Sequence, residues 1–199
     1  MDTTLPLLDP PSSALVLIDL QAGIVARDTA PLPARDVVRQ AVLLARTSRR
    51  VGALVVLVHV VATPGRPDAL HPRADEAPPA TATLPPGWSD IVPELGPEEG
   101  DVVIAKRQWG AFYGTDLDLQ LRRRRIETIV LAGISTNIGV ESTARDAYER
   151  GYQLVFASDA MAASTEADHR QTVTRIFPRI GRVRDTARIV AALGGREAS

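Results

Sequence analysis

The most distinctive candidate for chemistry in this chain is the amine of Lys106. Of the 23 Lys and Arg residues, it is the only lysine. An ammonium is a compact charge whose pKa shifts readily on burial, whereas a guanidinium stays charged and needs fork-shaped partners. We therefore expect position 106 to need an amine, although a Lys-poor sequence could also keep one lysine by chance. Lys106 ends the apolar run Asp101–Lys106, which favours a strand leading into a site.

Asp19 and Gly139 are two further candidates for catalytic positions. Asp19 ends an apolar, strand-like run, and a buried carboxylate there needs a cation such as the lone ammonium. Its alternative role is that of a turn or capping residue. Gly139 lies in a strand-to-helix turn, 131–140. If Thr136 or Asn137 caps that helix, the Gly139 N–H is free for an anion or a developing oxyanion. Close packing of helix against sheet is the alternative for this glycine.

Aromatic side chains gather just after the lysine. Trp109, Phe112 and Tyr113 are three of the eight aromatic residues. We expect Trp109 and Phe112 to wall a small, mostly apolar substrate pocket, and Tyr113 to pack in the core. Gln21, two residues after the first carboxylate, is a candidate polar contact to the substrate.

The sequence favours no metal and no cofactor. His59 lies inside an apolar run and is expected to be a core histidine. Asp68 and His71 follow in a proline-rich stretch, but their spacing matches no strong metal-ligand pattern. No glycine loop of the P-loop or dinucleotide type is present.

Composition excludes several classes of function. The net charge of −1 gives no reason to expect nucleic acid or a membrane surface as partner. The basic run Arg122–Arg125 fits a solvated helix end. No stretch is apolar enough for a membrane span, and the N-terminus lacks a signal-peptide pattern, so we expect a cytoplasmic protein. Cysteine is absent, which excludes disulfides, thiolate metal sites and a thiol nucleophile.

Apolar runs of strand length alternate with amphipathic stretches. This alternation, with β-branched strands, indicates one α/β domain over 1–199 with a parallel sheet, helices on both faces and right-handed crossovers. Strands are expected at 14–20, 53–61, 102–105, 128–132, 153–157 and near 182–183; helices are expected at 34–51, 115–125, 138–150, 166–177 and up to about 193.

One long segment, 62–100, breaks this alternation. It holds nine of the 15 prolines and has little hydrophobic periodicity. Long segments without regular structure in compact domains are usually functional or disordered. Because it follows the second strand, where such folds place loops over the ligand crevice, we interpret it as a lid or an oligomer contact.

Four segments resemble the isochorismatase-like hydrolase superfamily, which includes nicotinamidases and N-carbamoyl amidohydrolases. They lie in the same order over nearly the whole chain: Leu15–Gln21, Lys106–Leu117, Gly133–Tyr148, and Ser158–Ala162 with His169 beyond. The resemblance implies a three-layer α/β/α sandwich, Rossmann-like, with a six-stranded parallel sheet, assembled as homodimers or higher oligomers. It also implies a cis peptide bond before Ser135 and an oxyanion hole formed by the amides of Ser135 and Gly139.

One departure from the family pattern decides the chemistry. In the amidase branch, the position of Gly139 carries the nucleophilic cysteine of an Asp–Lys–Cys triad. Ser135 and Ser142 are not obvious substitutes for that thiol. The true isochorismatases also carry Gly there, and they hydrolyse a vinyl ether, which needs no nucleophilic side chain.

The resemblance therefore implies a non-covalent, isochorismatase-type hydrolase that acts on a small carboxylated enol ether in secondary metabolism. Asp19 would be the acid, and Lys106 would orient it or hold the substrate's carboxylate. The turn Ser135–Asn137 is of the amidase-like type, which argues against isochorismate itself. Two alternatives stay open: other acid–base chemistry in the same pocket, such as an isomerase or lyase step, and a non-catalytic ligand-binding role.

Overall fold

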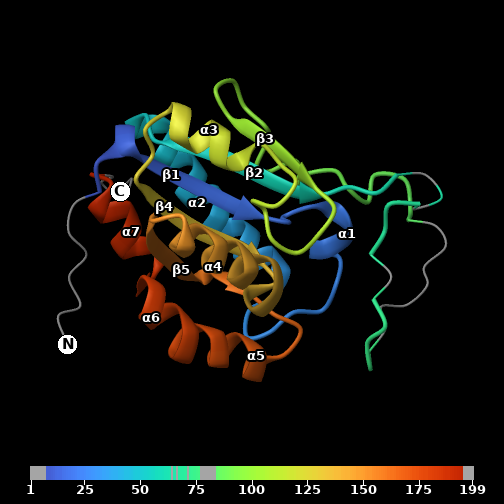
Figure 1. The fold of residues 1–199 in the computed structure, drawn as a ribbon. Coiled ribbons are helices and arrows are strands. Elements are labelled where there is room, and N and C mark those ends of the chain that lie inside the picture. Colours follow the sequence, from blue (N-terminus) through green and yellow to red (C-terminus); the bar gives the residue numbers. More distant parts are fainter. Residues whose placement is uncertain (1–7, 64, 66, 71, 77–83, 195–199) are drawn as a thin grey trace.

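The chain forms three layers around one parallel sheet (Figure 1). The strands are ordered β3-β2-β1-β4-β5-β6, and every pairing is parallel. The predicted α/β/α sandwich with a six-stranded parallel sheet is confirmed. The computed structural model describes residues 8–63, 65, 67–70, 72–76 and 84–194. The strands are β1 (Ser13–Ile18), β2 (Leu54–Val60), β3 (Val102–Lys106), β4 (Thr128–Ile134), β5 (Gln153–Ala162) and β6 (Arg182–Arg184).

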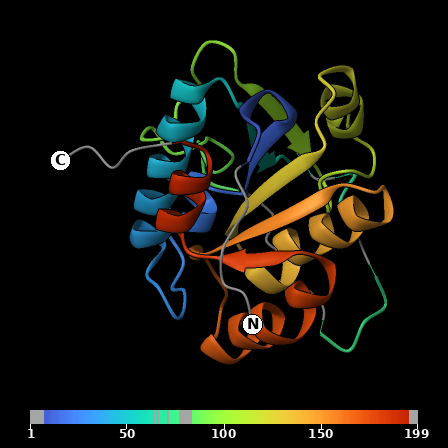
Figure 2. The ribbon, with the colours of Figure 1, turned by 90° about the vertical axis from the view of Figure 1, so that its left-hand side faces the viewer.

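Helices cover both faces of the sheet (Figure 2). On one face lie α2 (Ala34–Val51) and α7 (Thr186–Ala192), and on the other lie α3 (Leu117–Arg123), α4 (Glu141–Glu149) and α6 (Phe177–Ile180). The shorter elements are η1 (Pro10–Ser12), α1 (Ala22–Val25), η2 (Thr136–Val140), α5 (Glu166–Gln171) and η3 (Thr172–Ile176). Within the described residues, no helix is both long and apolar enough to cross a membrane.

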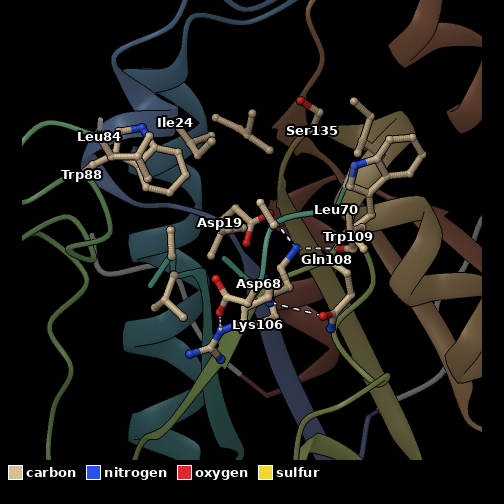
Figure 3. A pocket seen from close by; sticks show the side chains of 18 of the residues that line it. Asp19, Ile24, Asp68, Leu70, Leu84, Trp88, Lys106, Gln108, Trp109 and Ser135 are labelled. Atoms are coloured by element: carbon tan, nitrogen blue, oxygen red, sulfur yellow. Dashed lines mark hydrogen bonds and ion pairs between the residues drawn. The ribbon is translucent and has the colours of Figure 1, made fainter. Parts of the chain in front are cut away.

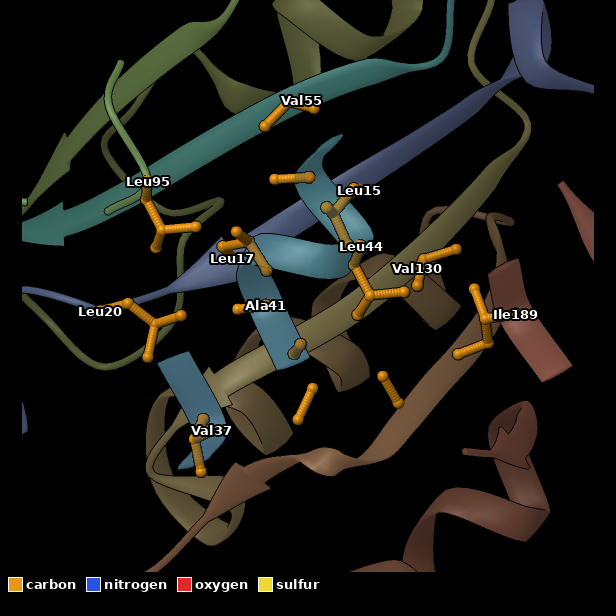
Figure 4. Close-up of a cluster of buried hydrophobic side chains, with 14 of the residues drawn as sticks. Leu15, Leu17, Leu20, Val37, Ala41, Leu44, Val55, Leu95, Val130 and Ile189 are labelled. Carbon is orange, nitrogen blue, oxygen red and sulfur yellow. The ribbon is translucent and has the colours of Figure 1, made fainter. Parts of the chain in front are cut away.

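The two cores follow from the two-residue period of a strand. In β1, Leu15 and Leu17 point to the α2 side, whereas Val16 and Ile18 point to the α4 side. Figure 4 shows the α2 core, where Leu44 packs over the leucines of β1. Because both faces are covered, β1 is buried along its whole length, which explains its continuous apolar sequence.

Most predicted elements are found, and the differences lie at their ends. The helix predicted at 34–51 has those bounds. The strand predicted at 153–157 continues to Ala162. The helix predicted from Ile138 starts earlier, with the π-helical turn η2. The helix predicted at 166–177 runs on as α5, η3 and α6.

Glycine at position 133 lets β4 approach β1 closely. Its φ is +126°, and a Cβ atom built on it would lie 2.1 Å from the Ile18 carbonyl oxygen. Any other residue would therefore push the two strands apart just where both reach the edge of the sheet. This close approach brings the end of β1 next to the turn that follows β4.

The proline-rich segment returns to pack on the chain that leaves β1. Gln21 and Ile91 form an antiparallel bridge, and the amide of Gly23 donates to the Trp88 carbonyl at 3.0 Å. A Cβ on Gly23 would lie 1.9 Å from the Trp88 ring. The described end of the segment is thus held against the carboxyl edge of the sheet.

Arg49 of α2 anchors the stretch that leads into β3. Its guanidinium donates to the Leu95 carbonyl at 2.6 Å, to Glu98 at 2.5 Å and to both carboxylate oxygens of Asp101 at 3.2 and 2.6 Å. Only 2% of the Asp101 side chain is exposed, so this carboxylate depends on Arg49 for its counter-charge.

Replacing Arg49 by Ala should lower the free energy of unfolding by about 3 kcal/mol, because it leaves a buried carboxylate unpaired. Urea denaturation followed by circular dichroism measures the change. The exposed neighbour Arg50 is the matched control, and Arg50→Ala should change stability by no more than about 0.5 kcal/mol. Equal effects of the two variants would show that Arg49 is not an anchor.

Candidate active site

A buried ion pair joins the ends of β1 and β3. Lys106 Nζ donates to Asp19 Oδ2 at 2.8 Å and to the Trp109 carbonyl oxygen at 2.6 Å (Figure 3). Lys106 is 1% exposed and Asp19 is 6% exposed. Since β2 separates β1 from β3 in the sheet, the long lysine side chain spans the width of a strand to reach the carboxylate. The sequence prediction that this ammonium could neutralise Asp19 agrees with the geometry.

The backbone at Asp19 has the left-handed conformation, with φ of 55°. Few residues other than glycine adopt it, although Asp tolerates it better than most. The Asp19 amide still donates to the Val58 carbonyl at 2.9 Å, as a sheet residue would. The chain therefore turns sharply at the carboxylate, and such backbone outliers gather at functional sites.

The free oxygen of Asp19 gives the site its acid–base character. Oδ1 is buried and has no hydrogen-bond partner among the described residues. Burial raises the pKa of Asp19 to about 6, against the lowering influence of Lys106 and, more weakly, His59. Desolvation outweighs the attraction of the ammonium. The carboxyl group therefore titrates close to neutral pH, as a proton donor or acceptor should.

Gly139 lies against the Asp19–Lys106 ion pair. A Cβ at this position would lie 2.9 Å from Ile18 Cγ2, 3.0 Å from Asp19 Oδ2 and 3.4 Å from Lys106 Nζ. The glycine therefore sits directly over the ion pair. The structure brings all three predicted catalytic positions together, and their catalytic role stays a prediction.

The turn that carries Gly139 begins at Ser135. The Ile134–Ser135 peptide bond is cis, as the family resemblance implied, and Ser135 and Gly139 both line the cavity. Their amides as an oxyanion hole remain a prediction. The predicted capping by Thr136 or Asn137 is wrong, because the residue before the helical turn is Ser135 and no side chain caps it.

Thr136 instead pairs with a histidine from a different element. Its hydroxyl lies 2.9 Å from Nδ1 of His169 on α5, and both residues are buried. Burial lowers the pKa of His169, so the ring is neutral at neutral pH. This contact ties the turn that carries Gly139 to α5. A single sequence offers no signal for it, because 33 residues separate the partners.

These groups line a cavity of about 490 Å³. Its apolar wall includes the only two tryptophans of the chain, Trp88 and Trp109. The predicted place of Trp109 agrees with the structure, and Figure 3 shows Trp88, Ile24 and Leu84 on the opposite side. Sequence reasoning missed several lining residues: Arg107 directly after the lysine, and Ile24, Arg27, Leu70, Leu84 and Trp88 outside the family motifs.

Gln21 is not among the residues that line the cavity, so the structure does not place it where a substrate contact was predicted. The residue is fully buried. Its side-chain amide donates to the carbonyls of Val60 and Trp88 at 3.1 and 3.2 Å, and its Oε1 accepts from the Val60 amide at 2.7 Å. With each polar atom bonded to backbone, Gln21 ties β2 and the Trp88 segment to the end of β1.

Phe112 and Tyr113 both lie elsewhere than predicted. Phe112 is 4% exposed and packs in the core that faces α4, with its ring 6.0 Å from that of Tyr152. It does not line the cavity, where the prediction had placed it. Tyr113, expected in the core, is 77% exposed. Adjacent residues in this irregular loop point in opposite directions, which no periodicity could predict.

The described residues contain no cluster of three His, Asp or Glu side chains suited to a metal ion. Asp68 accepts from Thr63 and from Arg107, and the Nδ1 atom of His59 lies 2.7 Å from the Ser89 carbonyl oxygen. His71 lies outside the described residues.

Replacing Gly139 by Ala should destabilise the protein by about 1–3 kcal/mol, because the new methyl group overpacks the ion pair and Ile18. Thermal or urea unfolding measures this loss. Gly110 is the matched control, since a Cβ there meets nothing closer than 3.5 Å; Gly110→Ala should be tolerated. If the two variants are equally stable, the space over the ion pair is larger than the structure indicates.

Comparison with known proteins places this site in a family. The family model described as the isochorismatase domain matches residues 13–188. The chain is 49% identical to the isochorismatase family protein YwoC of Bacillus subtilis, over 90% of this chain and 93% of the relative. It is 34% identical to the ureidoacrylate amidohydrolase RutB of Methylobacterium radiotolerans, over 94% of this chain and 81% of that protein.

Solved structures agree with this assignment. An isochorismatase family protein from Burkholderia thailandensis superposes with a TM-score of 0.91 at 46% identity, covering 96% of this chain and all of the other. The N-carbamoylsarcosine amidase of Thermoplasma acidophilum gives a TM-score of 0.70 at 30% identity, with 88% and 96% coverage. The chain belongs to the isochorismatase family and is a hydrolase of that family.

Proposed function

We propose that this protein hydrolyses a small carboxylated vinyl ether by acid catalysis, without a covalent intermediate. The observation that carries the proposal is the Asp19 carboxyl group. Its free oxygen is buried and unpartnered among the described residues, its pKa is raised to about 6, and it borders the cavity. A carboxylic acid in such a setting is a suitable donor of a proton to carbon.

The proposed reaction begins with proton transfer from the Asp19 carboxyl group to the substrate. Asp19 protonates the terminal CH₂ carbon of the enol ether, and an oxocarbenium ion forms at the neighbouring carbon. Water adds to this carbon and returns a proton to the Asp19 carboxylate. The resulting hemiketal breaks its bond to the ether oxygen and releases pyruvate and an alcohol. One water is consumed, and Asp19 ends in its starting state.

Lys106 has two roles in this proposal. Its bond to Oδ2 orients the carboxyl group, and its charge stabilises the carboxylate that remains after proton transfer. The same charge lowers the pKa of Asp19. With a pKa of about 6, roughly a tenth of the enzyme holds the proton at pH 7.

The absence of a side chain at position 139 supports a non-covalent route. The amidase branch that this chain resembles carries its cysteine there, whereas this chain has no cysteine at all. A nucleophile is therefore lacking where the family would place one. With glycine over the ion pair, this turn supplies no side-chain nucleophile and no side-chain proton acceptor beside the Asp19 carboxyl group.

A second candidate is hydrolysis of a C–N bond in a ureido or carbamoyl compound. It is favoured by the names of two relatives, a ureidoacrylate amidohydrolase and an N-carbamoylsarcosine amidase. Without a thiol, Asp19 would have to act as the general base that activates water. The two candidates need opposite protonation states of the same residue.

The pH dependence separates these candidates. The proton on Asp19 is present below pH 6 and is lost as the pH rises through that value. For an acid-catalysed vinyl ether hydrolase, kcat/KM should therefore fall about tenfold per pH unit above pH 6. A general base predicts the reverse, a rise that levels off above pH 6. Initial rates of pyruvate or ammonia release on enol ether and ureido substrate panels give the profile.

Removing either charge should abolish pyruvate release. Asp19→Asn should lower kcat/KM by about 10²–10⁴-fold, the usual contribution of a general acid. Lys106→Met should lower it too, and the remaining activity should have its pH midpoint shifted upwards, because the ammonium lowers the pKa of Asp19. Asp28→Asn, which removes an exposed carboxylate outside the cavity lining, is the control.

Full activity in both site variants would exclude this mechanism. Conversion without incorporation of ¹⁸O from water would indicate an isomerase or lyase. A wild type that binds ligands but turns over no substrate in either panel would indicate a binding protein.

A further inference from the structure

The charges around the cavity are not balanced. Three cations and two carboxylates line it. Lys106 is paired with Asp19, and Arg107 donates to Asp68 at 2.5 Å. Arg27 is the remaining cation, and among the described residues no acidic group lies within ion-pair distance of it. The cavity therefore carries a net positive charge, which grows when Asp19 takes up its proton.

The backbone holds Arg27 firmly at the cavity. It follows α1, whose Ile24 also lines the cavity. The Arg27 amide donates to the Ile24 carbonyl at 3.1 Å, so these two residues, three apart, share one side of the turn. The Trp88 segment packs against the start of α1 and keeps this turn in place.

The other two cations are less free to bind a substrate. Lys106 already donates to a carboxylate and a carbonyl, and it is almost fully buried. Arg107 faces Asp68, whose carboxylate is also held by Thr63 at 2.6 Å. An anionic ligand that bound this guanidinium would lie beside the negative charge of Asp68. Arg27 is exposed and has no such competitor.

We infer that Arg27 is the specificity-determining residue of this cavity and binds an anionic group, most simply a carboxylate, on a substrate with an apolar body. A guanidinium binds a carboxylate through two parallel hydrogen bonds. The inference rests on the proposed function for the reaction at Asp19, but it names the group that orients the substrate.

This placement gives the substrate a direction in the cavity. The buried Asp19–Lys106 pair forms the deep end, whereas Arg27 is solvent-exposed and belongs to the mouth. Apolar side chains also line the cavity, among them Ile24, Trp88 and Leu84 (Figure 3). A substrate held by Arg27 therefore presents its reacting bond to Asp19 and leaves its anionic group near solvent.

The chain offers a direct probe of this idea, because both of its tryptophans line the cavity. Titrations followed by tryptophan fluorescence would compare benzoate with benzamide, two probes of the same shape that differ in charge. The proteins are wild type, Arg27→Gln and, as a matched control, Arg46→Gln. Arg46 is exposed on α2 and does not line the cavity. Low ionic strength keeps the exposed guanidinium unscreened.

Wild type should bind benzoate about tenfold or more tightly than benzamide, the usual range for one charge-assisted pair. Arg27→Gln should lose this preference by weakening benzoate alone, while Arg46→Gln should keep it. The inference is overturned if Arg27→Gln retains the preference, if Arg46→Gln loses it equally, or if wild type shows none.

The variant Arg107→Gln tests whether the neighbouring cation, and not Arg27, binds the anionic group. If only this variant loses the benzoate preference, Arg107 is the anion-binding residue and the inference is wrong. The result is independent of turnover: an Arg27-dependent preference in a protein that releases no pyruvate would leave the inference intact and refute the proposed function.

Discussion

The structure depends on a single costly contact, the burial of an ammonium and a carboxylate at the carboxyl edge of the sheet. Removing two charges from water is expensive, and their attraction offsets the cost only when the geometry is good and other hydrogen bonds satisfy the donors. Lys106 meets this condition, since it contacts both Asp19 and the Trp109 carbonyl. Asp19 meets it on one oxygen only. Burial outweighs the attraction of Lys106 and raises the pKa of Asp19 to about 6, so its carboxyl group exchanges a proton near neutral pH.

The sheet order makes this contact possible. β1 lies between β2 and β4, so Asp19 leaves the sheet where the strand order reverses, which is the place where open α/β sheets bind ligands. Gly133 allows β4 to come close to β1, and the turn after β4 then lies over the ion pair. Thr136 and His169 hold that turn from the α5 side. The close approach of β1 and β4 and the turn after β4 thus help to bury the Asp19–Lys106 ion pair.

Gly139 determines what this arrangement is able to do. A side chain there would touch both members of the ion pair. Its absence means that this position supplies no covalent nucleophile beside the titrating carboxyl group. The same family framework therefore supports a chemistry based on proton transfer and water, even though relatives of this chain include proteins named as amidohydrolases.

The sequence by itself determined the α/β class, most of the helices and strands, and the three residues that meet in the site. Strand and helix periodicity are local properties, and a sole lysine, a carboxylate at a strand end and a glycine at a helix start are visible without coordinates. Tertiary structure alone decided which other residues share the cavity. Gln21 and Phe112 belong to the motifs but are used in packing. Arg27 follows α1, soon after the first motif, whereas Trp88 is brought in by the proline-rich segment that packs against the start of α1. Membership of a cavity depends on long-range packing of irregular segments, and these carry no periodic signal from which their side-chain directions could be predicted.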